Sequence, residues 1–486
     1  MKNINRRNFL KQSALATAAM GLSAKSWSQV AGANEDIRIA VVGFHGRGDN
    51  HISEWTKMKG VRLVALCDVD KKVLDNGVAK LKKDNNDIAG FIDIRKLLES
   101  KNLDAISIAT PNHWHALAAI WGIQAGKDVY LEKPVSHNVW EGRKIVEAAR
   151  KYNKIVQTGT QSRSSLAIRE AIEWVKAGNL GAIKISRGLC YKPRPSIGKT
   201  TGPQPVPESV DYNLWSGPAP LVPPRRNSSK WGTIHYDWHW FWNYGNGDMG
   251  NQGIHQMDIA RRFIDSNELS PRIFSVGGRL GYEDDGETPN TIMVYHDYGK
   301  VPLLFEVRGL PEKTGSTKMD KFKGADVGNI CHCENGYLVI THSYGHATAY
   351  DNHDKEIKKF EGEENHFANF IKAVRSRKVS DLNADILEGH LSSALCHTGN
   401  ISYRTGKQEK PEKIKEALKS DKEATETFER MASHLEANGV DLTKTKATLG
   451  TFLKMDTKAE TFTNNSAANK LLRRDYREPF VVPEKV

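Results

Sequence analysis

The feature that most constrains the fold of this chain is a glycine-rich turn between two short apolar segments near residue 45. The β-branched run at 37–42 is typical of a buried parallel strand. It leads into Gly-Phe-His-Gly-Arg-Gly at 43–48, and an amphipathic segment follows. A second apolar run, at 61–66, precedes Asp68, which lies 20 residues after Gly48. This order of strand, glycine turn, helix, strand and acidic residue predicts a βαβ unit that binds a dinucleotide.

The residue types of this turn suit contact with a pyrophosphate. Backbone N–H groups at a helix start face the phosphates in such turns, and we expect a cradle formed by Gly43, His45, Gly46, Arg47 and Gly48. We expect Asp68 to accept hydrogen bonds from the adenosine ribose and to repel a 2′-phosphate, which favours NAD over NADP. The second glycine of the G-x-G-x-x-G pattern is replaced by His45. We expect His45 to take a left-handed conformation at some cost, with Gly46 keeping the turn loose.

Further strands alternating with helices extend the same domain. Apolar runs at 104–109 and 128–131 each end in a polar segment, and helical segments at 116–124 and 141–152 follow them. Such alternation predicts a doubly wound parallel sheet, whose ligands lie at the carboxyl ends of its strands. We therefore expect five more side chains beside the dinucleotide: Thr110, Asn112, His115, Glu132 and Lys133.

A set of motifs in a fixed order resembles the Gfo/Idh/MocA family of NAD(P)-dependent oxidoreductases. The motifs are Val41-Val42-Gly43, Ala109-Thr110-Pro111-Asn112 with His115, Glu132-Lys133-Pro134, Asn251-Gln252-Gly253-Ile254-His255 with Asp258, and Asn365-His366-Phe367. The resemblance extends over residues 36–405. It implies an α/β protein with a Rossmann domain followed by an α/β domain that has a large, mostly antiparallel open sheet. It also implies a homodimer or homotetramer built on that sheet.

The second half of the sequence is compatible with this architecture. Strand-like stretches occur at 183–190, 273–280, 291–295, 303–308 and 337–340, and helical ones at 165–177, 253–263 and 365–374. Proline and glycine are frequent in 192–232, which predicts a long loop. We therefore divide the chain into a Rossmann domain at 34–157, a substrate and oligomerisation domain at 158–405, and an extension at 406–486. The extension wraps a neighbour or seals the substrate cleft, and the sequence leaves both open.

The resemblance places the family's catalytic lysine at Lys133 and its histidine at His255. Oxidation of a secondary alcohol needs a base for the hydroxyl proton. A partly desolvated lysine near a positive charge has a lowered pKa, and imidazole titrates near neutral pH. Family members often carry Asp where this chain has Asn251, and an amide cannot hold a proton. We therefore expect a Lys–His pair, with Asp248 close enough in sequence to replace the missing carboxylate.

Residues near the predicted site suit a carbohydrate. The segment 238–244 reads Trp-His-Trp-Phe-Trp-Asn-Tyr, and its rings match the apolar faces of sugars. The alternative is that these rings anchor the domain interface. Two polar residues follow another predicted strand end at Thr158. The residues that we expect to contact the substrate are Gln161, Arg163, Trp240, Asn251 and His255.

Residues 1–33 have the pattern of an export signal. The segment 5–11, Asn-Arg-Arg-Asn-Phe-Leu-Lys, resembles the twin-arginine signal, and a weakly apolar run at 14–24 follows. That run is too short to span a bilayer, and Ala-Gly-Ala at 31–33 suits cleavage. Five of the 70 basic residues and none of the 58 acidic ones lie in 1–33, so the remainder carries +7. No basic cluster typical of nucleic-acid binding occurs. We predict a periplasmic or otherwise exported protein with no membrane span in the mature chain.

The sequence gives little sign of a metal site. Its five cysteines form no disulfide framework, and Cys331-His332-Cys333 is their one cluster. A structural zinc site needs a second pair of ligands. The alternating pattern of 329–340, with a turn at Asn335-Gly336, predicts strands instead.

Three functions compete at this point. The first is an exported oxidoreductase that holds NAD tightly and oxidises a secondary hydroxyl of a sugar or glycoside, since free NAD is not expected outside the cytoplasm. The second is a glycoside-cleaving enzyme in which oxidation, elimination and return of the hydride leave no net redox change. Relatives of that type often lack the lysine of Glu-Lys-Pro, so Lys133 favours dehydrogenation. The third is a sugar sensor without catalysis, against which the presence of both Lys133 and His255 argues.

Overall fold

The computed structural model describes residues 36–84, 87–226, 232–264 and 266–486, so the predicted signal at 1–33 lies outside the described residues. Among them, a parallel sheet of six strands has the order β3-β2-β1-β4-β5-β6. The strands are β1 (Ile37–Val42), β2 (Val61–Cys67), β3 (Ala89–Phe91), β4 (Ala105–Ile108), β5 (Asp128–Leu131) and β6 (Val156–Thr158). The strand order reverses between β1 and β4, and a crevice for ligands opens there. This confirms the predicted doubly wound sheet.

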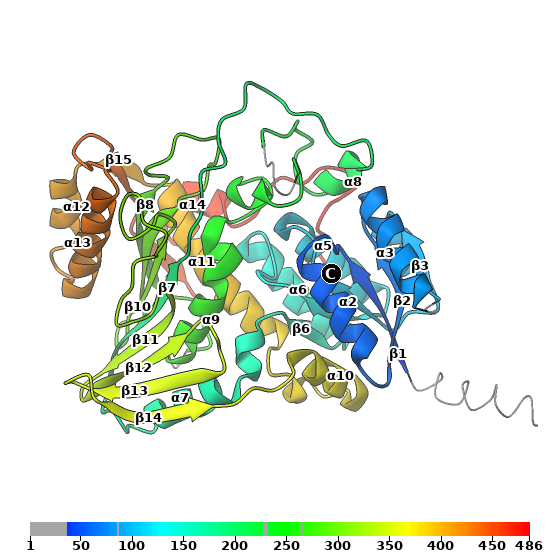
Figure 1. The fold of residues 1–486 in the computed structure, drawn as a ribbon, viewed down its shortest axis with the longest axis horizontal. Coiled ribbons are helices and arrows are strands. Elements are labelled where there is room, and N and C mark those ends of the chain that lie inside the picture. The colour runs from blue at the N-terminus through cyan, green and yellow to red at the C-terminus, as the bar shows by residue number, and fades with distance from the viewer. Residues whose placement is uncertain (1–35, 85–86, 227–231, 265) are drawn as a thin grey trace, which may run out of the picture.

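Helices cover both faces of this sheet (Figure 1). They are α2 (Arg47–Lys57), α3 (Lys71–Lys83), α4 (Ile94–Leu98), α5 (Asn112–Gln124) and α6 (Val139–Lys151). Helix α5 starts at Asn112, four residues before the predicted 116, directly after Pro111. Pro111 has φ −58°, which suits a residue at a helix start. The earlier start places Asn112 and His115 in the first turn, at the edge of the crevice.

The second domain has a mostly antiparallel sheet, as predicted. In the described part of the chain it has twelve strands, and β14-β13-β12-β11-β7-β10-β9-β8-β16-β15 form its main path. The strands are β7 (Ile183–Tyr191), β8 (Arg272–Gly278), β9 (Thr291–Asp297), β10 (Leu303–Arg308), β11 (Val327–Cys333), β12 (Gly336–Thr341), β13 (His346–Asp351), β14 (Glu356–Glu361), β15 (Lys407–Glu409), β16 (Ala447–Leu449), β17 (Leu453–Asp456) and β18 (Thr461–Phe462). Strands β7 and β10 pair in parallel. The Cys331-His332-Cys333 motif lies in β11, between β7 and β12, and its cysteines are buried free thiols.

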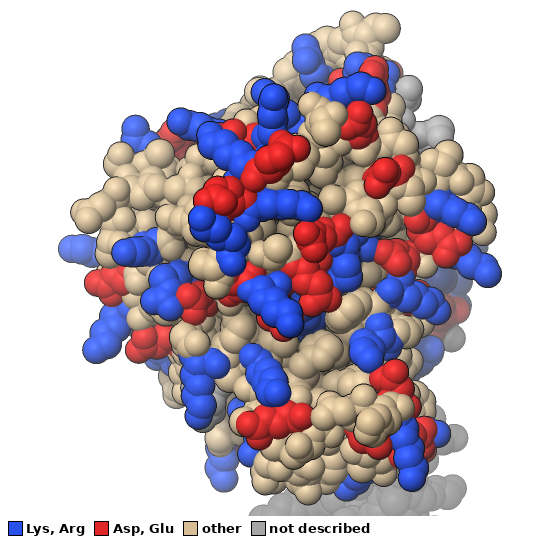
Figure 2. Space-filling model, turned by 90° about the vertical axis from the view of Figure 1, so that its left-hand side faces the viewer, with Lys and Arg blue, Asp and Glu red and all other residues tan. Residues whose placement is uncertain are grey.

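Helices pack on both faces of this large sheet (Figure 1). The helices that follow β6 in the chain are α7 (Leu166–Lys176), α8 (Tyr212–Ser216), α9 (Ile254–Arg262), α10 (His366–Ser376), α11 (Ile386–Arg404), α12 (Pro411–Leu418), α13 (Lys422–Ala437) and α14 (Ser466–Lys470), of which α8 and α10 lie against the first domain. Helices α9 and α11 lie on the side toward the Rossmann domain, and α12 and α13 cover the opposite face (Figure 1). Figure 2 shows the face around α12 and α13, where basic and acidic side chains are interspersed.

Helix α10 returns to the first domain. Its Phe367 and Phe370 belong to the same buried cluster as Trp55 and Tyr130, and the rings of Tyr130 and Phe367 stack with centroids 4.8 Å apart. The core of the first domain is therefore completed by residues more than 200 positions later in the chain. Sequence periodicity finds the helix but not the domain on which it packs.

The extension at 406–486 wraps around its own chain. Strands β16 and β17 pair with β8 and widen the large sheet. The last segment then crosses to the first domain, where Phe480 lies 5.5 Å from the ring of Trp114. Tyr476 donates a hydrogen bond to Glu141 of α6. The extension thus fastens one domain to the other.

No helix within the described ranges combines the length and the apolar character that a bilayer crossing requires.

Candidate dinucleotide and catalytic site

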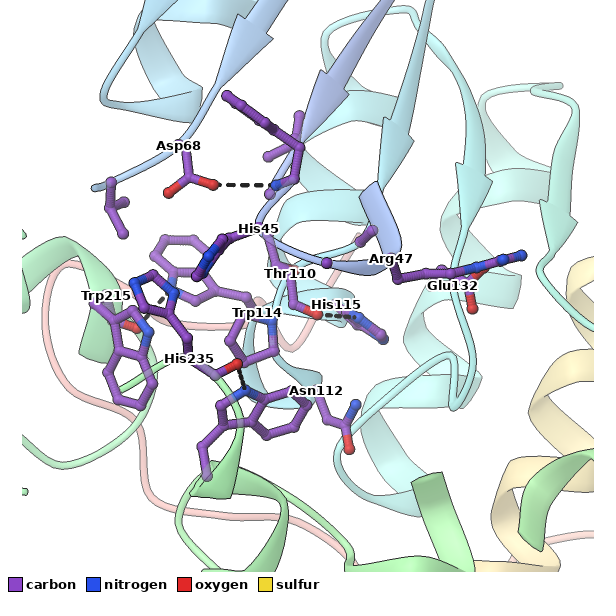
Figure 3. A pocket seen from close by; sticks show the side chains of 18 of the residues that line it. His45, Arg47, Asp68, Thr110, Asn112, Trp114, His115, Glu132, Trp215 and His235 are labelled. Carbon is purple, nitrogen blue, oxygen red and sulfur yellow. Dashed lines mark hydrogen bonds and ion pairs between the residues drawn. The ribbon is translucent and has the colours of Figure 1, made fainter. Parts of the chain in front are cut away.

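A cleft of about 340 Å³ opens at the carboxyl ends of the parallel strands (Figure 3). One wall belongs to the first domain, and the other comes from residues 214–251 of the second. The predicted site residues that line it are Gly43, His45, Gly46, Arg47, Asp68, Thr110, Asn112, His115, Glu132, Lys133 and Asn251. The predicted residues outside its lining are Gly48, Gln161, Arg163, Trp240 and His255.

Gly46 gives the glycine turn its shape. It has φ 118°, a backbone conformation that side chains rarely tolerate, and a Cβ placed there would meet no atom within 4 Å. His45 has no positive φ, so the expectation of a left-handed His45 is wrong. The turn uses the neighbouring glycine instead, which spares His45 the conformational cost. A Cβ on Gly48 would lie 2.1 Å from the Gly43 carbonyl oxygen, so Gly48 serves the close packing of α2 on the turn.

Asp68 lies at the end of β2, where the sequence places a ribose acceptor. Its carboxylate accepts hydrogen bonds from the backbone N–H groups of Phe44 (3.1 Å) and Asp70 (3.0 Å). Burial raises the pKa of Asp68 to about 6, although these two hydrogen bonds oppose the rise. The carboxylate is therefore held at the turn, facing the cleft (Figure 3).

Glu132 accepts four hydrogen bonds next to Lys133, at one side of the cleft. Its Oε1 accepts hydrogen bonds from Arg47 Nε (2.8 Å), Gln161 Nε2 (3.2 Å) and the His51 ring (3.1 Å). Its Oε2 accepts one from the backbone N–H of Lys133 (3.2 Å). Burial alone would raise the pKa of Glu132, but the charges of Arg47, His51 and Lys133 outweigh it and hold the pKa well below its usual range. Arg47 and Gln161 are thus tied to Glu132.

Lys133 lines the second-domain side of the cleft, and its charge acts on His255, which lies behind that wall. Lys133 Nζ donates a hydrogen bond to the backbone carbonyl of Asn251 (2.8 Å), and burial lowers the pKa of Lys133. His255 lies in the first turn of α9. Burial, and next the charge of Lys133, lower the pKa of His255 to about 3. Its Nδ1 is buried without a hydrogen-bond partner, so at neutral pH the ring is uncharged and has a free lone pair or N–H.

Asn251 lies on a π-helical turn, Met249–Gly253, that leads into α9. Its Nδ2 is also buried without a partner. Asp248, which the sequence offers as a replacement carboxylate, binds Arg194 through both oxygens (2.7 and 2.9 Å). The carboxylate of Asp248 is therefore occupied by an arginine.

Arg163 and Trp240 make contacts that are structural. Arg163 is buried and donates to both oxygens of Asp258 (2.9 Å each) and to Glu388 (2.9 Å). This network joins the segment after β6 to α9 and α11. Trp240 is buried in an aromatic cluster, with the Arg194 guanidinium 5.5 Å from its ring centroid. Its neighbours Trp238 and His239 are the ones that line the cleft, and their rings stack 3.7 Å apart.

The sequence did not reveal the part of the cleft wall that comes from the predicted loop at 192–232 and from the residues just after it. Trp215 and His235 line the cleft (Figure 3). The ring of His235 lies 4.0 Å from that of His45 and 3.0 Å from an oxygen of Asp70. The loop is also fastened by a hydrogen bond from Lys71 N to Ser209 O (2.7 Å). The signals were Trp215, in a segment otherwise rich in proline and glycine, and His235 just beyond that segment.

The residues present fit a dinucleotide. Gly46 leaves open space before the N-terminus of α2, where backbone N–H groups are available to phosphate. Thr110 Oγ1 and Asn112 Oδ1 are buried without hydrogen-bond partners at the cleft. The His115 ring places Nδ1 2.6 Å from the Pro134 carbonyl oxygen and Nε2 2.8 Å from that of Thr110, and its neutral form donates to one of the two. Within the described residues, no group of three or more His, Cys, Asp or Glu residues could hold a metal ion.

Two family models match the chain. "Oxidoreductase family, NAD-binding Rossmann fold" covers residues 37–160, and "Oxidoreductase family, C-terminal alpha/beta domain" covers 174–307. The chain belongs to the Gfo/Idh/MocA family of NAD-binding oxidoreductases. The family membership agrees with the strand order of the first sheet and with the large sheet of the second domain.

Individual relatives of this family member are distant. A "Glycosyl hydrolase family 109 protein" of Shewanella baltica strain OS185 is 31% identical over 177 residues, which is 32% of this chain and 39% of the relative. The WlbA dehydrogenase of Bordetella pertussis, solved with NADH and UDP-GlcNAcA, has 18% identity and a TM-score of 0.54, covering 74% of this chain and 94% of its own. The Chromobacterium violaceum WlbA structure, with the same two ligands, has 18% identity and a TM-score of 0.53, covering 74% and 91%. These structural likenesses show the fold alone.

Proposed function

We propose that this protein is an exported NAD-dependent oxidoreductase acting on a secondary hydroxyl of a sugar or glycoside, with tightly bound cofactor. The observation that carries the proposal is that Lys133 lies in the cleft wall, hydrogen-bonded to the Asn251 carbonyl (2.8 Å) of the turn that leads into His255. A bound nicotinamide supplies the hydride chemistry. An enzyme of this kind needs one group to orient a hydroxyl and a second to accept its proton.

Lys133 is the orienting group in this proposal. The Asn251 carbonyl holds its Nζ, and burial lowers the pKa of Lys133, which weakens its hold on its own proton. His255 is assigned as the base because its buried neutral ring has a nitrogen without a partner. Its pKa of about 3 makes it a weaker base than a free imidazole, so this role rests on its position and not on its basicity. Asn251, whose Nδ2 is also free, would orient a second hydroxyl. Trp238 and His239 offer ring surface to a sugar in the place that the sequence assigned to Trp240.

Replacing Lys133 or His255 tests the catalytic pair. We expect Lys133→Met and His255→Asn to lower kcat about a hundredfold or more, since positioned acid–base groups contribute about that much. Retention of bound NAD should be unchanged in His255→Asn. Product analysis by mass spectrometry on a mixed glycoside library supplies the measurement.

The matched control is Lys372→Met, on the exposed face of α10. Turnover in this variant should equal that of the parent protein. Full activity in both Lys133→Met and His255→Asn would contradict the catalytic roles that we propose for these two residues.

The second candidate function is redox-neutral cleavage of a glycoside. The name of the curated relatives favours it, although the chain spans about two fifths of their length. Oxidation at one sugar carbon would acidify the neighbouring C–H, elimination would break the glycosidic bond, and the hydride would then return. The presence of Lys133 favours plain oxidation over this candidate.

A panel of p-nitrophenyl glycosides separates the two candidates. With protein isolated with its own cofactor and no added acceptor, oxidation predicts a keto-glycoside in an amount limited to that of the enzyme. Cleavage predicts repeated release of nitrophenol without change in the cofactor's redox state. Multiple turnovers of nitrophenol would replace the first candidate by the second.

The NAD preference rests on Asp68, and it should depend on pH. Because burial raises the pKa of Asp68 to about 6, its carboxylate is charged above that pH and repels a 2′-phosphate. We expect the ratio of the NADPH to the NADH dissociation constant to rise between about pH 5 and about pH 8, where the 2′-phosphate also takes its second charge. In Asp68→Asn the 2′-phosphate still ionises but residue 68 does not, so the ratio of dissociation constants should rise less than in the parent protein. An equal rise in both proteins would contradict the role of Asp68.

Export is supported by the twin-arginine motif, which contains Arg6 and Arg7. An exported enzyme with a freely exchanging cofactor would lose it, so the proposal requires that NAD is bound before transport. In a host with this pathway, we expect Arg6→Lys with Arg7→Lys to shift the protein from the periplasmic to the cytoplasmic fraction. The exported parent protein should contain NAD when it is denatured and analysed. Export of the double variant, or an exported protein without NAD, would contradict this part of the proposal.

A further inference from the structure

A second cavity, of about 940 Å³, lies beside the C-terminal end of α11. Its walls come from α11, from the segment 242–246 and from the extension at 466–475. It has no lining residue in common with the dinucleotide cleft. The proposed oxidoreductase function uses none of its residues.

The cavity is strongly basic. Arg404, Lys470, Arg473 and Arg474 line it, against the one carboxylate of Asp475. Arg473 forms an ion pair with Glu484 (2.6 Å). For Arg404 and Lys470, the described residues provide no ion-pair partner within 4.0 Å. These two cations are therefore available to an anionic ligand.

Arg474 is held in the wall of this cavity. Its Nη1 donates to the carbonyl of Asn243 (3.1 Å), and its Nε is buried without a partner. Burial lowers the pKa of the Arg474 guanidinium, and the Glu141 carboxylate opposes that shift. A buried guanidinium with an unused N–H gains from an anionic acceptor placed beside it.

Two amide side chains in the wall of the same cavity have oxygens without hydrogen-bond partners. Asn246 Nδ2 donates to the His137 carbonyl (2.9 Å), and Asn400 Nδ2 donates to the Asn246 carbonyl (3.0 Å). These bonds fix which end of each amide is the oxygen. Both Oδ1 atoms are buried without partners, on side chains that are 6% and 3% exposed. Unpartnered acceptors call for donors, and hydroxyl groups supply them.

An aromatic ring completes the set. Trp242 lines the cavity, and the guanidinium of Arg404 lies 4.9 Å from its ring centroid. A ring beside a cation suits a ligand with an apolar face and a charged group. The wall of this cavity therefore combines the four basic side chains, the amides of Asn246 and Asn400, and the indole of Trp242.

We propose that this cavity binds a hydroxylated organic anion, a sugar that carries a carboxylate or a phosphate. The anionic group would bind Arg404, Arg474 and Lys470, and the hydroxyls would donate to the Oδ1 atoms of Asn246 and Asn400. A neutral sugar would leave the cations without a partner. A bare inorganic anion would leave the two amide oxygens without donors.

Calorimetric titration of the full chain with its bound dinucleotide tests the proposal. The probes are glucuronate, glucose 6-phosphate, glucose and inorganic phosphate. We expect saturable one-to-one binding of glucuronate or of glucose 6-phosphate, and no binding of glucose at the same concentrations. The stronger of the two anions identifies the charged group, and its affinity should fall as salt is added. The absence of binding by both, or equally tight binding of inorganic phosphate, would overturn the proposal.

Variants assign the binding to this cavity. Arg404→Gln removes a cation from an exposed side chain, and Asn400→Asp puts a negative charge where the amide oxygen lies. Each should weaken binding about tenfold or more, since a charge-assisted hydrogen bond of about 1.4 kcal/mol corresponds to that factor. The matched control is Arg272→Gln at a surface pair with Asp297, which should bind as the parent does.

Lys133→Met distinguishes this site from the cleft. It changes the proposed catalytic machinery and leaves the cavity intact, so the anion should bind it as it binds the parent protein. If Lys133→Met lost binding while Arg404→Gln bound as the parent protein does, the anion would lie in the dinucleotide cleft and the proposal would be overturned. Because the readout is binding, failure of the oxidoreductase function would leave this result unaffected.

Discussion

The buried carboxylate of Glu132 is the interaction on which the site depends. A buried charge is tolerated only when its partners satisfy it, and Glu132 receives hydrogen bonds from Arg47, His51, Gln161 and the Lys133 backbone. These donors come from the glycine turn, from α2, from the segment after β6 and from the strand end itself. Since the pKa of Glu132 lies below its usual range, the stabilisation is complete above the pKa of an unfolded glutamate. It is lost as the pH falls through the lower folded-state pKa.

The second domain completes what the first domain begins. The parallel sheet supplies the glycine turn and Lys133, but Asn251 and His255 come from the π-helical turn and the start of α9. The loop that carries Trp215 lines the cleft and is hydrogen-bonded to Val69 and Lys71, in the segment between β2 and α3 and at the start of α3. Catalysis on this scaffold would therefore require that the two domains keep a fixed relative position, so that groups from both can form hydrogen bonds to one substrate. Helix α10 and the extension provide that connection by packing on the first domain.

The fold was predictable because its strands are short β-branched runs with polar ends. The positions of Asp68 and Lys133 at strand ends follow from that pattern together with the sheet topology. Other features depend on contacts between distant residues. Arg163 was predicted to bind substrate from its nearness to a strand end, yet its charge is neutralised by Asp258, 95 positions away. The positive φ of the glycine turn was expected at His45 because His45 stands where the motif has glycine. The structure has it at Gly46.

The path of the extension bears on how the protein is made. Phe480, Val482 and Val486 lie in the same buried cluster as the strands and α5 of the first domain. A ribosome synthesises the N-terminal segment first, and N-terminal domains commonly fold while the rest is still being made. Here part of the core of the dinucleotide domain is supplied by residues 480–486, which follow the whole second domain in the chain. The first domain therefore reaches its final packing only after the second domain and residues 480–486 have been synthesised and have packed against it.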